Sequence, residues 1–354
     1  MSAVIAAPCR ESDMALLRVP PQSRLVAPAR RCGYAMYDPV QAFREAILAA
    51  LGHAPEVIEP GRLHRFPTSD RRGDDAGWCK LFDDLRGGVF GCHRQGISET
   101  WSAADRAAMT RGQRGELARQ VMAATAQREA EQRRQWAENA RRIAQVWAQC
   151  VPLVPGDPVT LYLKRRGFGG VWPLPELLRL HRALPYWHGA EKLGTFPAIV
   201  APIIAPDGRT VALHRTYLAA DGRKADLPSP KKLTGAAGPL AGACIPLHKP
   251  ARGCIGIAEG IETALAAWCA SAVPTVAAYC AGNVAAWRWP VGVQRLVIFA
   301  DADKAGREAA DTLRARAIRA GLQVSVMTPT DAGTDWCDVW AERGAVLIDA
   351  GVAA

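Results

Sequence analysis

The sequence predicts an α/β protein that ends in a mostly parallel four-stranded sheet with flanking helices. An α+β region and a small β-rich amino-terminal domain precede this sheet. Two observations predict the fold. In residues 251–354, short apolar strands alternate with helical segments, which is typical of a parallel sheet with right-handed crossovers. In front of them, short β-rich pieces are separated by turn residues rather than helices, which favours antiparallel pairing.

Length and composition limit the class of protein. A chain of 354 residues is long enough for two or three domains that each bury a core. No run approaches the roughly 18 apolar residues of a membrane helix, and the first 35 residues lack the pattern of a secretory signal. The ten cysteines are scattered without a CxxC pair, which favours reduced thiols over a disulfide framework. We therefore expect a cytoplasmic protein with no membrane partner.

The net charge of +10 is unevenly distributed along the chain. Residues 251–354 contain 9 Lys or Arg against 11 Asp or Glu, a net charge of −2, which leaves +12 for residues 1–250. A basic front part joined to an acidic back part suggests a polyanion held by one and a metal ion held by the other. The alternative is an arginine-rich surface without a specific partner.

The front of the chain divides into a tail and a small domain. Residues 1–35 are rich in Pro, Ala and Arg without periodicity and predict a disordered basic tail. Residues 36–102 predict a small β-rich domain. It begins with a helix over 41–51 that has Phe43, Ile47 and Leu51 on one face. Short aromatic strands separated by turns follow this helix.

A connector and a strand-rich region come next. Residues 103–150 predict a charged helical connector with nine Arg against five acidic residues, which Gly112 and Gly115 are expected to divide. A solvated helix is the first interpretation, and contact with nucleic acid is the alternative. Residues 151–250 predict short strands and turns. The run Pro206-Asp207-Gly208 there indicates a hairpin between two β-rich stretches.

The last hundred residues are the most regular part of the sequence. Apolar runs predict four strands, at 255–258, 275–279, 295–300 and 322–327. Helical segments lie between them, at 261–270, from 283 onward, and at 305–320.

Three carboxylates follow the strands of this expected sheet. Glu259 comes one residue after the first strand, and Asp301 and Asp303 come directly after the third. Ligands bind beyond the carboxyl ends of parallel strands, so these side chains can reach the same edge. Mg²⁺ takes one or two protein carboxylates and completes its octahedron with water and substrate phosphate. The constellation therefore predicts a Mg²⁺ (or Mn²⁺) site. The alternative is that the acids only cap the following helices.

The residues around these carboxylates resemble the Toprim domain. The segment 258–266, with Glu259-Gly260, is similar to its Glu-Gly motif, and 299–310 is similar to its DxD motif. The segment 333–338 resembles the Asp-Trp-Asn-Asp segment that closes this domain in phage- and plasmid-encoded primases, although Cys337 replaces the asparagine. The resemblance implies that Glu259, Asp301 and Asp303 are catalytic and hold metal. Asp335 and Asp338 either help to position the metal or cap a helix.

The resemblance extends upstream and covers about residues 155–345. Residues 196–232 are similar to the basic half of a primase catalytic core, in which a strand pair and a lysine-bearing loop face the metal site. The resemblance implies contacts to nucleotide and DNA from Arg215, Lys231, Lys232 and Lys304. Cations placed there would hold a triphosphate and offset transition-state charge, whereas the alternative is a solvated loop.

The front domain, with His64-Arg65-Phe66, Gly77-Trp78 and residues 88–96, also resembles the head of mobile-element primases. In classical primases a zinc ribbon built on paired cysteines occupies this place. The available ligands, His64, Cys79, Cys92 and His93, lack ligand-like spacing, so we expect no zinc and a metal-free β-ribbon. Core positions are expected, rather than base-stacking platforms, for four aromatic residues: Trp78, Phe82, Phe90 and Trp101.

The function implied by the resemblance is that of a DNA primase. Such an enzyme makes short RNA primers on single-stranded DNA from ribonucleoside triphosphates, with Glu259 holding metal or acting as general base. The sequence contains no GxxxxGK[ST] loop, so a separately encoded replicative helicase is a candidate partner. Two alternatives stay open. One is a Toprim nuclease that uses the same acids, and the other is a non-catalytic replication accessory protein that binds single-stranded DNA.

Overall fold

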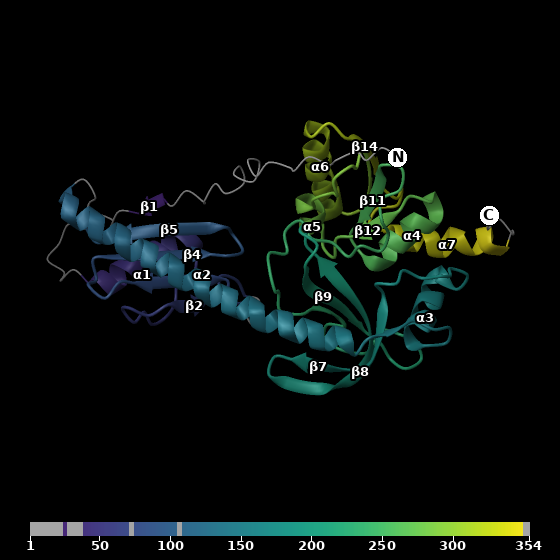
Figure 1. Cartoon of the computed structure of the whole chain (residues 1–354), viewed down its shortest axis with the longest axis horizontal. Helices are drawn as coiled ribbons and strands as arrows, with labels where there is room; N and C mark the ends of the chain where they lie inside the picture. The colour runs from purple at the N-terminus through teal and green to yellow at the C-terminus, as the bar shows by residue number, and fades with distance from the viewer. Residues whose placement is uncertain (1–23, 27–37, 71–73, 105–107, 350–354) are drawn as a thin grey trace, which may run out of the picture. The chain divides into compact units, whose positions relative to one another are not determined.

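The computed structural model describes residues 24–26, 38–70, 74–104 and 108–349 (Figure 1). They belong to two compact units, Met1–Gln132 and Arg133–Ala354, which are described separately below. The expected disordered tail lies outside the described residues, apart from strand β1 (Arg24–Val26). None of the described helices combines the length and apolarity that crossing a membrane requires.

The first unit contains a five-stranded sheet with the order β1-β5-β4-β3-β2. All neighbouring strands are antiparallel except β1 and β5. The other strands are β2 (His64–Phe66), β3 (Gly77–Leu81), β4 (Gly87–Cys92) and β5 (Ile97–Ser102).

Helix α1 (Pro39–Leu51) packs against this sheet through the face that its periodicity predicts. The Asp38 side chain caps its first turn by accepting a hydrogen bond from the backbone N–H of Val40, and Gly52 ends the helix in a left-handed conformation, φ 75°. Phe43, Ile47 and Leu51 are buried as expected. The Phe43 ring lies 5.3 Å from that of Trp101.

The four aromatic residues of this unit are core residues, as predicted. Trp78, Phe82, Phe90 and Trp101 are each no more than 4% exposed. The Arg128 guanidinium lies over the Trp78 ring, 4.3 Å from its centre, so a nucleic-acid base cannot stack on that face of the ring.

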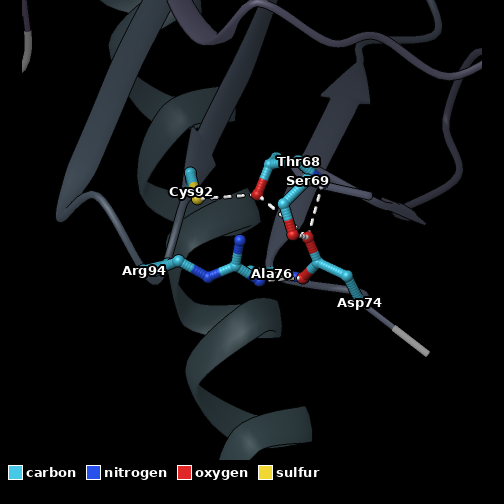
Figure 2. A network of polar contacts seen from close by, with 6 residues as sticks. All are labelled: Thr68, Ser69, Asp74, Ala76, Cys92 and Arg94. Carbon is cyan, nitrogen blue, oxygen red and sulfur yellow. Dashed lines mark hydrogen bonds and ion pairs between the residues drawn. The ribbon is translucent and has the colours of Figure 1, made fainter. Parts of the chain in front are cut away.

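A buried carboxylate organises the loop before β3 (Figure 2). Asp74 accepts hydrogen bonds from the Thr68 and Ala76 backbone N–H groups and from the Ser69 hydroxyl, and it forms an ion pair with Arg94. These contacts hold the pKa of Asp74 well below its usual range, with the Arg94 hydrogen bond as the largest cause.

Helix α2 (Arg111–Ala148) is continuous, so the expected division at Gly112 and Gly115 is wrong. Both glycines fall in its first turns, where a reciprocal capping box holds the backbone. In this box the Thr110 N–H donates to the Gln113 side chain, and the Gln113 N–H donates to the Thr110 hydroxyl. Ala124 is buried with Trp78 in the first unit, whereas Ile143 is buried in the second.

The second unit begins with an antiparallel sheet of the order β10-β9-β8-β7-β6. The predicted hairpin at 206–208 is confirmed, because it joins β8 to β9. A short helix, α3 (Pro158–Leu163), continues into a π-turn at Lys164–Phe168. The strands are β6 (Val151–Pro152), β7 (Arg179–His188), β8 (Glu191–Ile204), β9 (Thr210–Tyr217) and β10 (Lys231–Leu233).

The predicted four-stranded sheet is also present, and all its strands are parallel, in the order β12-β11-β13-β14. The strands are β11 (Cys254–Ala258), β12 (Thr275–Ala277), β13 (Arg295–Phe299) and β14 (Gln323–Met327). The helices are α4 (Ile261–Ser271), α5 (Ala281–Ala286), α6 (Lys304–Arg319) and α7 (Trp336–Asp349), of which α7 was not expected.

Alternate residues of β13 bury themselves on opposite faces of this sheet, which gives three layers (Figure 1). Val297 and Phe299 face the side of α4 and α7, whereas Leu296 and Ile298 face the side of α5 and α6. The first of these cores also contains β8 residues. In addition, Cys244 bridges to β8 and Ile245 to β12, so the two sheets share one core.

Candidate active site

The parallel register brings the ends of β11 and β13 together. Ala258 lies beside Phe299 in the paired strands, so Glu259 and Asp301 emerge at the same edge of the sheet. They line a pocket of about 190 Å³ together with Asp335. Three basic residues also line the pocket and are called the basic wall: Arg166, Lys224 and Lys231. The rest of the lining is Gly260, Glu262 and Thr263.

Asp301 is held in a position that disfavours its charge. Its Oδ1 atom is buried and has no hydrogen-bond partner among the described residues. Burial, followed by the negative charges of Glu259 and Asp335, raises the pKa of Asp301 to about 7. Gly306 allows the start of α6 to approach this residue, because a Cβ atom there would lie 2.6 Å from the Asp301 carbonyl oxygen.

Glu259 shares this environment. Burial and then the charge of Asp303 raise its pKa, while the Lys231 ammonium partly offsets them. Two carboxylates that repel each other, one with an orphaned buried oxygen, form a donor set that fits a hard divalent cation. In the part of the chain that the structure describes, no three His, Cys, Asp or Glu side chains form a ready metal-binding group. Mg²⁺ does not require one, since it often takes only one or two protein carboxylates.

Asp303 has a structural task of its own. It is the N-cap of α6, where its side chain accepts a hydrogen bond from the Gly306 N–H at 2.7 Å. Its charge nonetheless acts on Glu259 and Asp301. The two interpretations of this residue, ligand and cap, are therefore compatible.

Replacing Asp303 by alanine is expected to lower the free energy of unfolding by about 1 kcal/mol, because the first turn of α6 loses its cap. Chemical denaturation measures this change, and Asp311→Ala, an exposed position on the same helix, is the control. Equal stabilities of the two variants would show that the cap contributes nothing.

Asp335 and Asp338 cap the start of α7. The Asp338 N–H donates to Asp335 at 2.9 Å and the Asp335 N–H donates to Asp338 at 3.2 Å, which is a reciprocal capping box. Asp338 also faces Arg166 at 3.9 Å. Of the two, only Asp335 lines the pocket.

The basic wall has a buried anchor in Glu262. Lys231 Nζ lies 3.1 Å from the Glu262 carboxylate, which also accepts a hydrogen bond from the Tyr162 hydroxyl at 2.6 Å. The Glu262 side chain is 8% exposed and that of Lys231 is 42% exposed. Burial alone would raise the pKa of Glu262, but the Lys231 charge and the Tyr162 hydrogen bond outweigh it and lower that pKa. Glu262 therefore holds the lysine at the pocket as a fixed cation.

Arg215 and Lys232 lie on the other face of the antiparallel sheet. Arg215 of β9 pairs with Lys232 of β10. Lys231 is the neighbouring residue of β10, so its side chain points to the opposite face. The Arg215 guanidinium donates to the Leu233 carbonyl and to the Tyr217 hydroxyl, and Lys232 lies 4.2 Å from the Tyr186 ring centre. Only Lys231 of these three reaches the carboxylates. Lys304 is exposed at the start of α6, where it lies 3.8 Å from Glu308. Contacts of all four cations with nucleotide or DNA stay predictions.

The four residues considered as zinc ligands have other surroundings. The His64 ring contacts the Glu59 backbone N–H at 2.9 Å, and the Cys92 thiol lies 3.3 Å from the Thr68 hydroxyl. Burial raises the pKa of Cys79 to about 12 and lowers that of His93.

Sequence reasoning missed several residues of the pocket. Arg166 belongs to the run Lys164-Arg165-Arg166, a concentration of charge that could have indicated a phosphate contact. Lys224 follows the turn at Gly222, and Tyr162 is separated from Glu262 by a hundred residues. Glu262 stands within the Glu-Gly segment but reads as an ordinary first-turn acid.

Two family models match consecutive parts of the second unit. Residues 254–346 match the Toprim domain, and they include all four strands of the parallel sheet. The carboxyl-terminal part of the chain is therefore a Toprim domain, as the resemblance implied. Residues 137–244 match a domain of unknown function, DUF7146. No curated protein matches the chain.

Several solved structures are similar to this chain at low identity. A DNA primase domain from Pseudomonas aeruginosa is 16% identical, with a TM-score of 0.32, and the match covers 48% of this chain and 56% of that one. The DnaG catalytic core is 15% identical (62% and 78% covered, TM-score 0.37). The Aquifex aeolicus primase, with its zinc-binding and RNA polymerase domains, is 14% identical (89% and 86% covered, TM-score 0.35). These values are too low to assign an activity to this chain.

Proposed function

We propose that the second unit catalyses Mg²⁺-dependent nucleotidyl transfer and makes short RNA primers on single-stranded DNA from ribonucleoside triphosphates. The observation that supports this most is the composition of the pocket. Glu259, Asp301 and Asp335, called the acidic wall, line the same cavity as the basic wall. A metal ion with a triphosphate requires both, because carboxylates hold the cation while lysine and arginine bind phosphate oxygens.

Each wall has a separate task in this proposal. Glu259 and Asp301 hold the metal, which when bound supplies activation of the 3′-hydroxyl and charge neutralisation at the pyrophosphate leaving group. Lys231, fixed by Glu262, binds the triphosphate from the other side. In the alternative role of Glu259, Asp301 holds the metal, and Glu259, whose pKa is raised, accepts the proton of the attacking hydroxyl as general base.

The partners of this reaction follow from its chemistry. They are a single-stranded DNA template, ribonucleoside triphosphates, and Mg²⁺ or Mn²⁺, with a separately encoded replicative helicase as a further partner. The reaction belongs in the cytoplasm, and no zinc is needed for it.

The test is incorporation of labelled ribonucleotide on single-stranded templates by the full chain with Mg²⁺ or Mn²⁺, alongside cleavage of the same strand. We expect template-dependent products that Asp301→Asn loses and the surface control Asp311→Asn keeps. Cleavage without extension would replace the primase by a nuclease. DNA binding that survives Glu259→Gln, with no activity in the parent protein, would identify an accessory protein.

A further inference from the structure

The amino ends of the parallel strands form an edge of their own, opposite the carboxylates. Cys254, Arg295 and Gln323 lie side by side in the register of β11, β13 and β14. The loops that precede them are joined there, because the N–H groups of Gln294 and Arg295 donate to the Gly253 carbonyl at 2.8 and 3.0 Å. Helix α6 runs from the pocket back to this edge, since β13 and β14 are parallel.

Five arginines gather at this edge, which we name the arginine edge: Arg252, Arg288, Arg295, Arg316 and Arg319. Arg252 precedes β11, Arg295 begins β13, and Arg319 ends α6. All except Arg316 are exposed.

Arg316 is the fixed centre of this group. Its guanidinium donates to the carbonyls of Ala285 and Trp287 at 2.6 and 3.0 Å and lies 5.7 Å from the Trp289 ring centre. Burial, and then the charges of Arg288 and Arg319, lower the pKa of Arg316. The Arg288 side chain passes over Gly242, where a Cβ atom would lie 3.0 Å from its Cγ.

Within the described part of the chain, no ion pair involves any of these five arginines, whereas carboxylates pair with other exposed arginines, such as Arg62, Arg119 and Arg209. Residues 251–354 carry a net charge of −2, yet five of their nine Lys and Arg residues stand at this edge. The domain therefore has an acidic pole at the pocket and a basic pole at the opposite edge.

We propose that the arginine edge binds the phosphate backbone of a nucleic-acid strand outside the catalytic pocket. Guanidinium groups match phosphate oxygens in charge and geometry, and several of them along one edge of the sheet suit a polymer with regularly repeated charges better than a single small anion. The net charge of +10 favours a nucleic acid, in which every nucleotide carries a phosphate charge, over an acidic protein segment.

The test is the salt dependence of binding of a fluorescent single-stranded oligonucleotide to the full chain, without nucleotides. We expect the triple variant Arg288→Gln/Arg295→Gln/Arg319→Gln to bind about 10-fold more weakly at low salt. The slope of log K against log salt should fall by about 2, or about 0.7 for each lost phosphate contact. The matched control, Arg62→Gln/Arg119→Gln/Arg209→Gln, removes three arginines that already pair with carboxylates and should leave both values unchanged.

Two results would overturn the proposal. One is wild-type affinity and slope in the triple variant, or an equal loss in the control, which would make the effect one of net charge alone. The other is displacement of the oligonucleotide by polyglutamate from the parent protein but not from the triple variant, which would indicate an acidic protein partner. The binding experiment is repeated in the Asp301→Asn background, which is expected to lack primer synthesis. Binding at the arginine edge can therefore be tested even if the proposed primase activity is wrong.

Discussion

Replacing Asp301 by asparagine is expected to remove primer synthesis while it stabilises the metal-free protein. The loss of rate should be on the order of 10³-fold, because the variant lacks one of the two half-buried carboxylates that hold the cation, and the cation offsets the negative charge of the transition state. Damage to the fold would lower activity and stability together. In Asp301→Asn the activity should fall while the stability rises. This combination indicates that neighbouring negative charges repel the Asp301 carboxylate in the parent protein.

The pH dependence follows from the direction of the pKa shift. The folded-state pKa of Asp301, about 7, lies above its unfolded value, so the folded protein keeps the proton longer. The stability that protonation contributes is fully present below about pH 4 and is lost as pH rises through 7. At pH 8 without metal, the asparagine variant should exceed the parent by on the order of 2 kcal/mol, after allowance for the partial exposure of this residue.

Denaturation in the presence of a chelator at pH 5 and pH 8 measures this difference. The gain from Asp301→Asn should be larger at pH 8, and Asp311→Asn should show none. Mg²⁺ should then stabilise the parent at pH 8 and leave the asparagine variant unchanged. A variant that is no more stable than the parent at pH 8 would contradict the charge repulsion on which the site rests.

The parallel sheet could be predicted because each of its strands and helices is indicated by residues that are close together in the sequence. Each strand is a short apolar run, each helix follows it closely, and the chemistry stands at the strand ends, as with Glu259 and Asp301. Helix α7 was not among the predicted helices, although helix capping was one of the two roles expected of Asp335 and Asp338. Its capping box, Asp335 with Asp338, was available in the sequence and explains why the helix begins there.

The basic wall was less predictable, because it depends on register. A shift of one residue moves a strand side chain to the other face of the sheet. Lys231 and Lys232 are adjacent in the sequence, yet one reaches Glu262 and the other lies on the Tyr186 ring. Nothing in a Lys-Lys pair tells which one faces the pocket. Arg166 and Lys224 come from a π-turn and a loop, whose positions depend on tertiary packing.

The lysine at the pocket is expected to have two separable roles, one in stability and one in nucleotide binding. Lys231→Met leaves the buried Glu262 carboxylate with Tyr162 as its remaining partner and should lower the free energy of unfolding by about 3 kcal/mol. It also removes the cation that faces the triphosphate. The KM for ribonucleotide should therefore rise by about 10-fold or more.

The double variant Lys231→Met/Glu262→Gln separates these roles. Removing both charges leaves no unpaired buried carboxylate, and the glutamine can still accept the Tyr162 hydrogen bond, so most of the lost stability should return. Nucleotide affinity should stay low, because no cation has been restored. Lys249→Met, at an exposed lysine outside the pocket, is the control for both measurements. If the double variant regains nucleotide affinity together with stability, Lys231 only neutralises Glu262, and the triphosphate must be bound by Arg166 and Lys224.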